Sequence, residues 1–121
     1  RVRDCSLLGP VATGMHLADL GAEVIKIESP GGGDYIRKTA FPIIAGVSLL
    51  HWHINRGKRS LALDLRTAAG VEVFLELVKV SDVVIEAMRP GALDRRGLSY
   101  QRMRAVNPRI VYCHVSGYGL T

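Results

Sequence analysis

The chain has 121 residues, the size of a single domain, and 48% of them are hydrophobic, which is enough for a packed core. Its net charge of +5 is moderate, and its 16 Lys and Arg residues do not gather with aromatic residues into the basic surface typical of nucleic-acid-binding proteins. We therefore expect no nucleic-acid partner and, because no apolar run reaches membrane-spanning length and no signal-peptide pattern is present, a cytoplasmic protein that does not enter a membrane.

The first third of the chain predicts a strand, a helix and a second strand. A weak strand pattern covers Arg1–Ser6, and Pro10 is placed to start a helix over Val11–Leu20. The stretch Glu23–Glu28 is short and rich in β-branched residues, as strands are. The next segment, Ser29–Thr39, contains three consecutive glycines and predicts a flexible loop. The apolar residues that can share one face of the first helix are Met15, Leu17 and Leu20.

The middle of the chain predicts two helices around a strand. Apolar residues at helical spacing favour a helix over Gly46–Ile54, and Ser60–Leu65 alternates as a strand does. The clearest helix covers Ala68–Val80, with Thr67 as its N-terminal cap. Its apolar stripe consists of Val71, Phe74, Leu75 and Val78.

The last third predicts a strand over Asp82–Ala87, a short helix capped by Ser99 that ends before Asn107, and a strand over Arg109–Ser116. Both strands contain consecutive apolar residues, which is typical of strands covered on both faces. Strands that alternate with helices predict an α/β fold, namely a Rossmann-like parallel sheet with flanking helices.

Basic residues gather around the ends of two predicted strands. Lys58, Arg59 and Arg66 surround the strand at 60–65, and Arg89, Arg95 and Arg96 follow the strand at 82–87. Guanidinium and ammonium groups of this kind bind phosphates, so the first group predicts contacts with the phosphates of a nucleotide-bearing ligand. The second group strengthens this hypothesis, because ligands of open α/β sheets bind at one edge of the sheet. The alternative is that both groups are merely solvated.

The turn at Gly9 and the acid at Glu28 hint at a dinucleotide site. Glu28 closes its predicted strand 19 residues after Gly9, close to the acidic position that binds a ribose in dinucleotide folds. However, the glycines do not have the G-x-G-x-x-G spacing of that motif. The pattern alone favours the alternative, an ordinary turn followed by an exposed glutamate at the end of the strand.

The sequence contains no motif for a metal site, a redox-active cysteine pair or a catalytic nucleophile. The four histidines share no helix face at metal-binding spacing, and the two cysteines, Cys5 and Cys113, are far apart, so no metal site or redox pair is predicted. We interpret Cys113 as a small buried hydrophobic residue. Asp34 and Asp94 are expected to be exposed loop acids, and no residue is nominated as a catalytic nucleophile.

The order of short motifs resembles the amino-terminal part of family III coenzyme A transferases, the CaiB/BaiF group, over 1–121. That group includes formyl-CoA transferases and α-methylacyl-CoA racemases. The matching stretches are Gly9-Pro10-x-Ala12-Thr13, Leu17–Glu28, Gly33-Asp34-x-x-Arg37, Asn55-Arg56-x-Lys58-Arg59-Ser60, Leu63-Asp64-Leu65, Asp82–Glu86, Arg89-Pro90-Gly91, Asn107-Pro108-Arg109 and Ser116-Gly117-Tyr118-Gly119.

The resemblance implies an incomplete amino-terminal CoA-binding lobe over 1–121, part of a larger fold in which two chains interlock as a homodimer. It also implies acyl-CoA and a carboxylic acid as substrates. The residues that match CoA-lining positions of the family are Leu63, Arg66, Ala87, Met88 and Arg95. At the position where many members carry an arginine beside the adenine, this chain has Ser29.

The resemblance further implies that the catalytic groups lie beyond this chain. The transferases of the family form acyl-enzyme intermediates on an aspartate downstream of the Ser-Gly-Tyr-Gly stretch, and the racemases use a downstream histidine and aspartate. We expect the CoA-binding portion of a transferase. The alternatives are a racemase fragment, a non-catalytic CoA-binding or dimerisation module, and a nicotinamide-dinucleotide domain, against which the failed glycine spacing argues.

Overall fold

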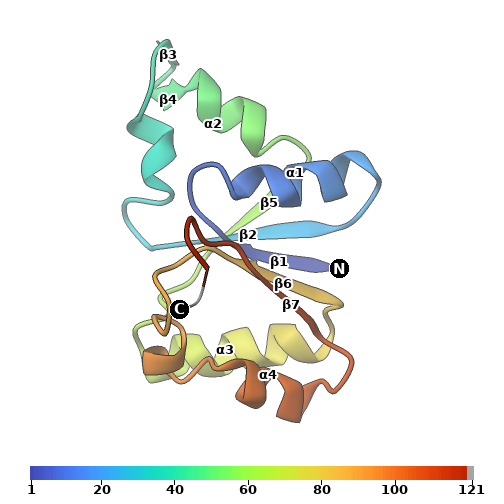
Figure 1. Cartoon of the computed structure of the whole chain (residues 1–121). Helices are drawn as coiled ribbons and strands as arrows, with labels where there is room; N and C mark the ends of the chain where they lie inside the picture. Colours follow the sequence, from blue (N-terminus) through green and yellow to red (C-terminus); the bar gives the residue numbers. More distant parts are fainter. Residues whose placement is uncertain (120–121) are drawn as a thin grey trace.

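The computed structural model describes residues 1–119, and Leu120 and Thr121, the last residues of the expected lobe, lie outside the described part. These residues form a five-stranded sheet between two layers of helices (Figure 1). All four neighbouring pairs are parallel, in the order β5-β2-β1-β6-β7, which confirms the predicted parallel α/β fold. The strands are β1 (Val2–Cys5), β2 (Val24–Glu28), β5 (Arg59–Ala62), β6 (Val83–Glu86) and β7 (Val111–His114).

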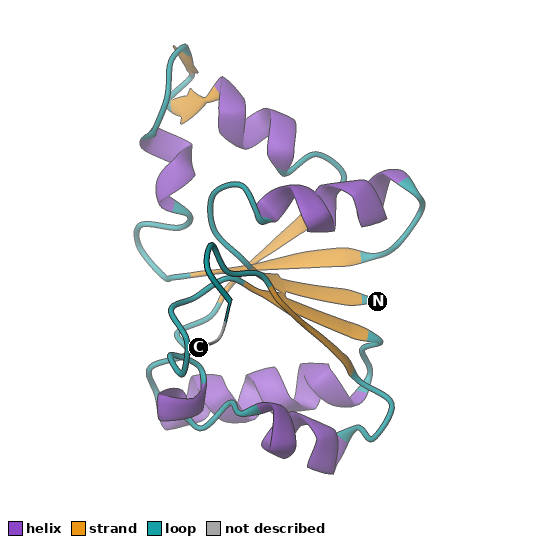
Figure 2. Ribbon diagram, viewed as in Figure 1, coloured by secondary structure: helices purple, strands orange, loops and turns teal. Residues whose placement is uncertain are grey.

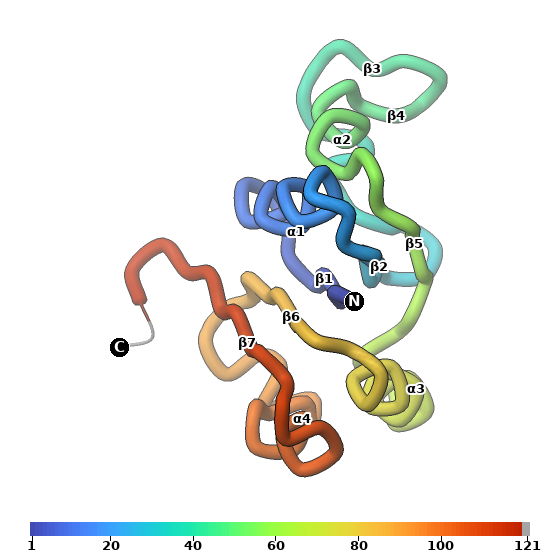
Figure 3. Tube along the Cα trace, turned by 90° about the vertical axis from the view of Figure 1, so that its right-hand side faces the viewer, coloured from blue at the N-terminus to red at the C-terminus, as the bar shows by residue number. Residues whose placement is uncertain are grey.

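Helices cover both faces of the sheet (Figure 2). One face carries α1 (Val11–Asp19) and α2 (Leu49–Ile54), and the other carries α3 (Ala68–Lys79) and α4 (Tyr100–Val106). A view turned by 90° shows the two layers on opposite sides of the strands (Figure 3). No helix within residues 1–119 combines the length and apolar character needed to cross a membrane.

The strand with the weakest sequence signal is the centre of the sheet. β1 pairs with β2 on one side and with β6 on the other, and all four of its residues are buried. Its sequence includes Arg3 and Asp4, whose charges weaken the apolar pattern. Both side chains are nevertheless buried, and hydrogen bonds from the Ser6 amide, the Ser6 hydroxyl and the Lys58 ammonium offset the cost of burying the Asp4 carboxylate.

The segment between β2 and β5 differs from its prediction. The expected helix over 46–54 begins only at Leu49, because Val47–Ser48 forms β4, a short antiparallel partner of β3 (Ile43–Ile44). The expected flexible loop over 29–39 contains a 3-10 helix, η1 (Tyr35–Lys38). A second 3-10 helix, η2 (Asp94–Arg96), follows β6.

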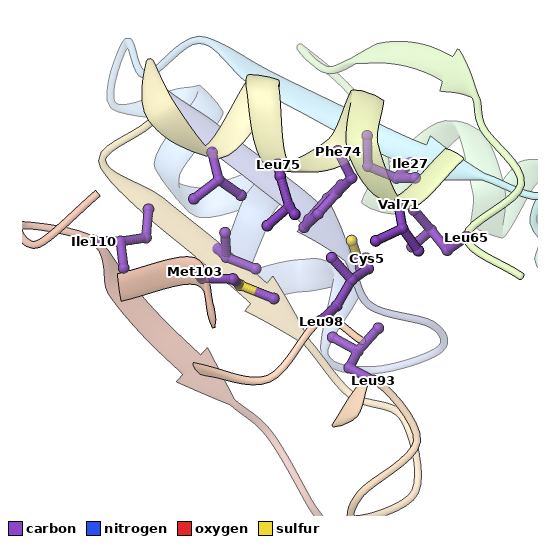
Figure 4. Packing of buried hydrophobic residues seen from close by; sticks show 12 residues of the cluster. Cys5, Ile27, Leu65, Val71, Phe74, Leu75, Leu93, Leu98, Met103 and Ile110 are labelled. Atoms are coloured by element: carbon purple, nitrogen blue, oxygen red, sulfur yellow. The ribbon is translucent and has the colours of Figure 1, made fainter. Parts of the chain in front are cut away.

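The main core lies between the sheet and the α3–α4 layer (Figure 4). The predicted stripe of α3 is confirmed, since Val71, Phe74, Leu75 and Val78 are all buried against Met103 of α4 and their neighbours. The apolar face expected for the first helix is wrong at Leu20, which is 84% exposed because α1 ends at Asp19. Cys113 is only partly buried and packs on a second, smaller cluster around Val2, Val24 and Ile85.

Candidate functional site

A pocket of about 310 Å³ opens at the carboxyl edge of the sheet. The loops that follow β1, β2, β5 and β6 all contribute to it, so residues far apart in the sequence meet there. Ligands of open α/β sheets bind at this edge. The lining residues are Cys5, Leu7, Ile27, Glu28, Ser29, Gly33, Asp34, Tyr35, Leu63, Asp64, Leu65, Arg66, Met88 and Arg96.

The floor of the pocket is apolar. Cys5, Ile27 and Leu65 belong to the buried core, and Leu63 and Met88 pack against it while remaining partly accessible. Burial raises the pKa of the Cys5 thiol to about 12. The sulfur is therefore protonated at neutral pH and serves as part of an apolar surface rather than as a nucleophile.

Glu28, the acid at the end of β2, is committed to contacts within the protein. Its two carboxylate oxygens accept hydrogen bonds from the Arg37 guanidinium at 2.7 and 2.8 Å, from the Asp34 amide at 2.7 Å and from the Ser60 hydroxyl at 2.8 Å. Burial opposes ionisation of Glu28, but these donors outweigh it and lower its pKa to about 2. The carboxylate is thus already saturated with hydrogen bonds. The dinucleotide interpretation requires a carboxylate that is free to bind a ribose, and Glu28 does not provide one.

Asp34 is not the exposed loop acid that we expected from the sequence; it is 1% exposed. Its Oδ1 accepts a hydrogen bond from the Ile36 amide at 3.0 Å and so caps η1, while its Oδ2 lies 3.3 Å from Lys26 Nζ. The loop glycines fold the chain back over β2 and bring this acid to a buried lysine. Asp94 is exposed, as predicted.

The basic group around β5 is divided between the two ends of the strand. Lys58 is buried under α1, where its Nζ pairs with Asp4 and donates to the Val11 carbonyl, both at 2.7 Å. Arg59 begins β5 at the opposite edge from the pocket, and its guanidinium lies 3.7 Å from Glu23. Arg66 follows β5 and lines the pocket. Only one of these three predicted phosphate ligands is therefore at the carboxyl edge.

Arg66 is held in a fork-to-fork contact with Asp64. The guanidinium Nε and Nη2 donate to the two Asp64 oxygens at 2.8 and 2.9 Å. Hydrogen bonds from the Arg66 side chain and amide lower the pKa of Asp64 to about 2. The Arg66 side chain is still 69% exposed, so its remaining donors face the solvent at the mouth of the pocket.

Four of the predicted site residues line the same pocket, namely Ser29, Leu63, Arg66 and Met88. Ala87 precedes Met88 directly after β6, and Arg95 lies in η2 outside the lining. The sequence placed Arg96 in the basic group after this strand but not among the predicted CoA contacts, and in the structure it is Arg96, not Arg95, that lines the pocket. The sequence placed both arginines after β6, but only the 3-10 turn of η2 decides which side chain faces the pocket.

A second polar cluster lies where β6 and β7 end. Glu86 is buried and accepts hydrogen bonds from the Met88 amide at 2.8 Å, from Tyr112 Oη at 3.0 Å and from His114 Nδ1. Burial raises the pKa of Tyr112 to about 12, so this hydroxyl is a donor. The cluster borders a cavity of about 590 Å³ between η2, α4 and β7. Nowhere among residues 1–119 do His, Cys, Asp and Glu side chains form a group that could hold a metal ion.

Comparison with known proteins relates the chain to the CoA-transferases of family III. The sequence model of CoA-transferase family III matches residues 4–121. The chain is 44% identical over 115 residues to human succinyl-CoA:glutarate CoA-transferase, covering 95% of this chain and 26% of that protein. It is also 44% identical over 115 residues to the acetyl-CoA:oxalate CoA-transferase of Acetobacter aceti, covering 95% of this chain and 29% of that protein.

Solved structures agree with this result. A CaiB/BaiF family protein from Brucella suis superposes with a TM-score of 0.85 at 44% identity, covering 99% of this chain and 33% of that one. The D175A mutant of Rv3272 from Mycobacterium tuberculosis gives a TM-score of 0.86 at 39% identity, covering 100% of this chain and 33% of that one. The chain thus spans between a quarter and a third of the length of these relatives.

Proposed function

We propose that this chain, which belongs to CoA-transferase family III, forms the lobe that binds coenzyme A in an enzyme that moves CoA between carboxylic acids. The observation that carries the proposal is the pocket at the carboxyl edge of the sheet, with its apolar floor and cationic rim. CoA needs both features, because its adenine offers a flat apolar face while its 3′-phosphate and its diphosphate carry negative charge.

The lining residues have distinct roles in this proposal. Leu63 and Met88 contact the adenine, Ser29 lies beside the nucleotide, and Arg66 binds a phosphate with the donors that Asp64 leaves free. Ala87 and Arg95 lie next to the pocket and remain predicted contacts. Lys58 and Arg59 were predicted from charge alone, and their pairing with Asp4 and Glu23 gives the proposal no support.

The reaction itself requires groups beyond this lobe. In the proposed enzyme an acyl-CoA and a carboxylic acid exchange CoA through an acyl intermediate on an aspartate outside this chain, and two subunits interlock as a homodimer. Anchoring the nucleotide here contributes uniform binding, which lowers the KM for acyl-CoA without taking part in the reaction at the distant thioester. The transferase names of the similar proteins favour this reaction over the racemase alternative, in which a proton is exchanged beside the thioester.

Steady-state kinetics of Arg66→Ala in the full-length enzyme tests the proposal. Because Arg66 would bind a part of CoA that does not react, we expect the KM for acyl-CoA to rise about tenfold while kcat changes little. Arg104→Ala is the matched control, since Arg104 is an exposed arginine of α4 outside the pocket lining. An Arg66→Ala enzyme with the KM of the control would contradict the role of Arg66.

A further inference from the structure

Four charged side chains are buried beside the pocket. Asp4, Lys26, Asp34 and Lys58 each expose at most 2% of the side chain. They form two ion pairs, Lys58 Nζ with Asp4 Oδ2 at 2.7 Å and Lys26 Nζ with Asp34 Oδ2 at 3.3 Å. A buried ion pair adds little stability compared with apolar side chains of the same volume, because both charges lose their hydration. What the charges provide instead is directional contact, and the contacts of Lys26 involve two loops of the pocket.

Lys26, in β2, contacts both the loop that follows β1 and the loop that follows its own strand. Its Nζ donates a hydrogen bond to the Ser6 carbonyl in the first loop and lies 3.3 Å from Asp34 Oδ2 in the second. Leu7 of the first loop and Asp34 of the second line the pocket. Among residues 1–119, no hydrogen bond or ion pair joins the loops over 6–10 and 29–34 directly. Lys26 is therefore the polar link between these two parts of the pocket wall.

Each loop is also fixed close to its contact with Lys26. The Ser6 amide donates to Asp4 Oδ1 at 2.9 Å, which holds the residue whose carbonyl Lys26 binds. Asp34 Oδ1 accepts a hydrogen bond from the Ile36 amide at 3.0 Å, which orients the carboxylate. Asp34 Oδ2 accepts no hydrogen bond from residues 1–119, so Lys26 supplies the charge that it faces. Loops that are ordered before a ligand arrives do not have to be ordered by binding, which favours high affinity.

We infer that Lys26 is a positioning residue of this pocket, which ties the loop after β1 to the loop after β2 and so raises the affinity for CoA without touching it. The inference rests on the proposed function, because CoA is the ligand whose affinity the link would set. Lys26 is 2% exposed, so it acts through the Ser6 carbonyl and the Asp34 carboxylate. Its neighbours Ile25 and Ile27 contact the main core, so Lys26 points to the other face of the sheet and the fold should survive its replacement.

Calorimetric titration of the 121-residue chain with CoA tests the inference on four proteins, each confirmed as folded by circular dichroism. They are wild type, Lys26→Met, Asp34→Asn and the double variant Lys26→Met/Asp34→Asn. Methionine keeps the length of the lysine stem but cannot donate a hydrogen bond to Ser6, and asparagine keeps an oxygen for the Ile36 amide. We expect Lys26→Met and the double variant to bind CoA about tenfold more weakly than wild type, and Asp34→Asn to show a smaller loss.

Asp34→Asn separates positioning from charge. This substitution raises the net charge by one, so a pocket that depended on charge alone would bind the anionic CoA more tightly. The double variant has the net charge of wild type, so charge alone would leave its affinity unchanged. Weaker binding in both variants is therefore the result that a positioning role predicts, and it can be obtained even where Lys26→Met alone does not fold.

Two control variants lie outside the pocket lining. Lys79→Met removes the same charge from an exposed residue of α3, and Val78→Ala removes packing from the buried core; both should bind CoA like wild type. Wild-type affinity in the double variant, tighter binding by Asp34→Asn, or an equal loss in Val78→Ala would overturn the inference and leave the CoA-binding function standing. Failure of the folded wild-type chain to bind CoA would instead overturn the proposed function, and the inference with it.

Discussion

Glu28 shows how a single residue can look functional in the sequence and be structural in the fold. It stands at the end of β2, where dinucleotide-binding proteins place an acid for the ribose. Here Arg37, Ser60 and the Asp34 amide occupy both carboxylate oxygens and fix the loop over 29–39 against the sheet. These contacts explain the Gly33-Asp34-x-x-Arg37 motif. Asp34 and Arg37 supply hydrogen-bond donors to Glu28, and residue 33 has no room for a side chain, because a Cβ there would lie 2.7 Å from Glu28 Oε2.

Replacing Glu28 with Gln should change how stability depends on pH. The pKa of Glu28 is lowered from 4.5 to about 2 in the folded chain. A lowered pKa stabilises the folded state above pH 4.5, and this contribution is lost as the pH falls toward 2. We expect Glu28→Gln to unfold in urea with a free energy roughly 2–3 kcal/mol lower at pH 7, and the difference from wild type to shrink between pH 4.5 and 2.

Glu72→Gln provides the comparison for this experiment. Glu72 is exposed and pairs with the exposed Arg102, so the loss of this ion pair should cost less than about 1 kcal/mol. A difference between wild type and Glu28→Gln that stays constant from pH 7 to pH 2 would contradict the stabilising role of the ionised carboxylate.

At the level of elements, the sequence predicted regular segments well and local irregularities poorly. The stripe of α3 and the cap at Thr67 were read correctly, because both depend on residues within the helix itself. The β3–β4 hairpin was missed, since each strand has only two residues and Ile43 and Ile44 are exposed. The helical spacing of the apolar residues near Val47 concealed the real start of α2, where Ser48 caps it.

The turn from β5 into α3 depends on a glycine. A Cβ at Gly70 would stand 1.9 Å from the Asp64 carbonyl oxygen, so alanine cannot fit unless the turn that carries Arg66 moves. We expect Gly70→Ala to lower the free energy of unfolding by about 2 kcal/mol or more, although alanine normally favours helices. Urea unfolding monitored by circular dichroism measures this cost.

Gly32→Ala is the matched control for that substitution. Among residues 1–119, no atom lies within 4 Å of the place where a Cβ at Gly32 would stand, and the Gly32 backbone is not in the left-handed region. Its stability should stay within about 0.5 kcal/mol of wild type. Equal stability of the two alanine variants would show that the turn accommodates a side chain at Gly70.

For the whole molecule, the alternation of elements indicated a parallel sheet but not the order of its strands. That order brings the ends of β1, β2, β5 and β6 to one pocket, and it separates Lys58 and Arg59 from Arg66. The sequence could predict that cations follow the strands. It could not predict which of them pair with Asp4 or Glu23, because such pairs form between residues distant in the chain.

The layer that contains β3, β4 and α2 exposes apolar side chains, including Phe41 at 91%, Trp52 at 60% and Ile44 at 56%. Exposed apolar groups of this size favour association in water. We expect light scattering to detect self-association of the 121-residue chain at micromolar concentrations, and the double variant Phe41→Ser/Trp52→Ser to reduce it. Tyr118→Ser is the control, because Tyr118 is an equally exposed aromatic residue outside this layer. A wild-type chain that stays monomeric would contradict this expectation.

The pocket at the carboxyl edge of the sheet should bind CoA rather than a nicotinamide dinucleotide. Calorimetric titration of the folded 121-residue chain with CoA and, separately, with NAD tests it most directly. We expect CoA to bind and added salt to weaken its binding, because phosphates meet arginine side chains. We expect NAD not to bind, because the Glu28 carboxylate is already saturated with hydrogen bonds. Binding of NAD in place of CoA, or a folded chain that binds neither ligand, would show that this lobe is not a CoA-binding lobe.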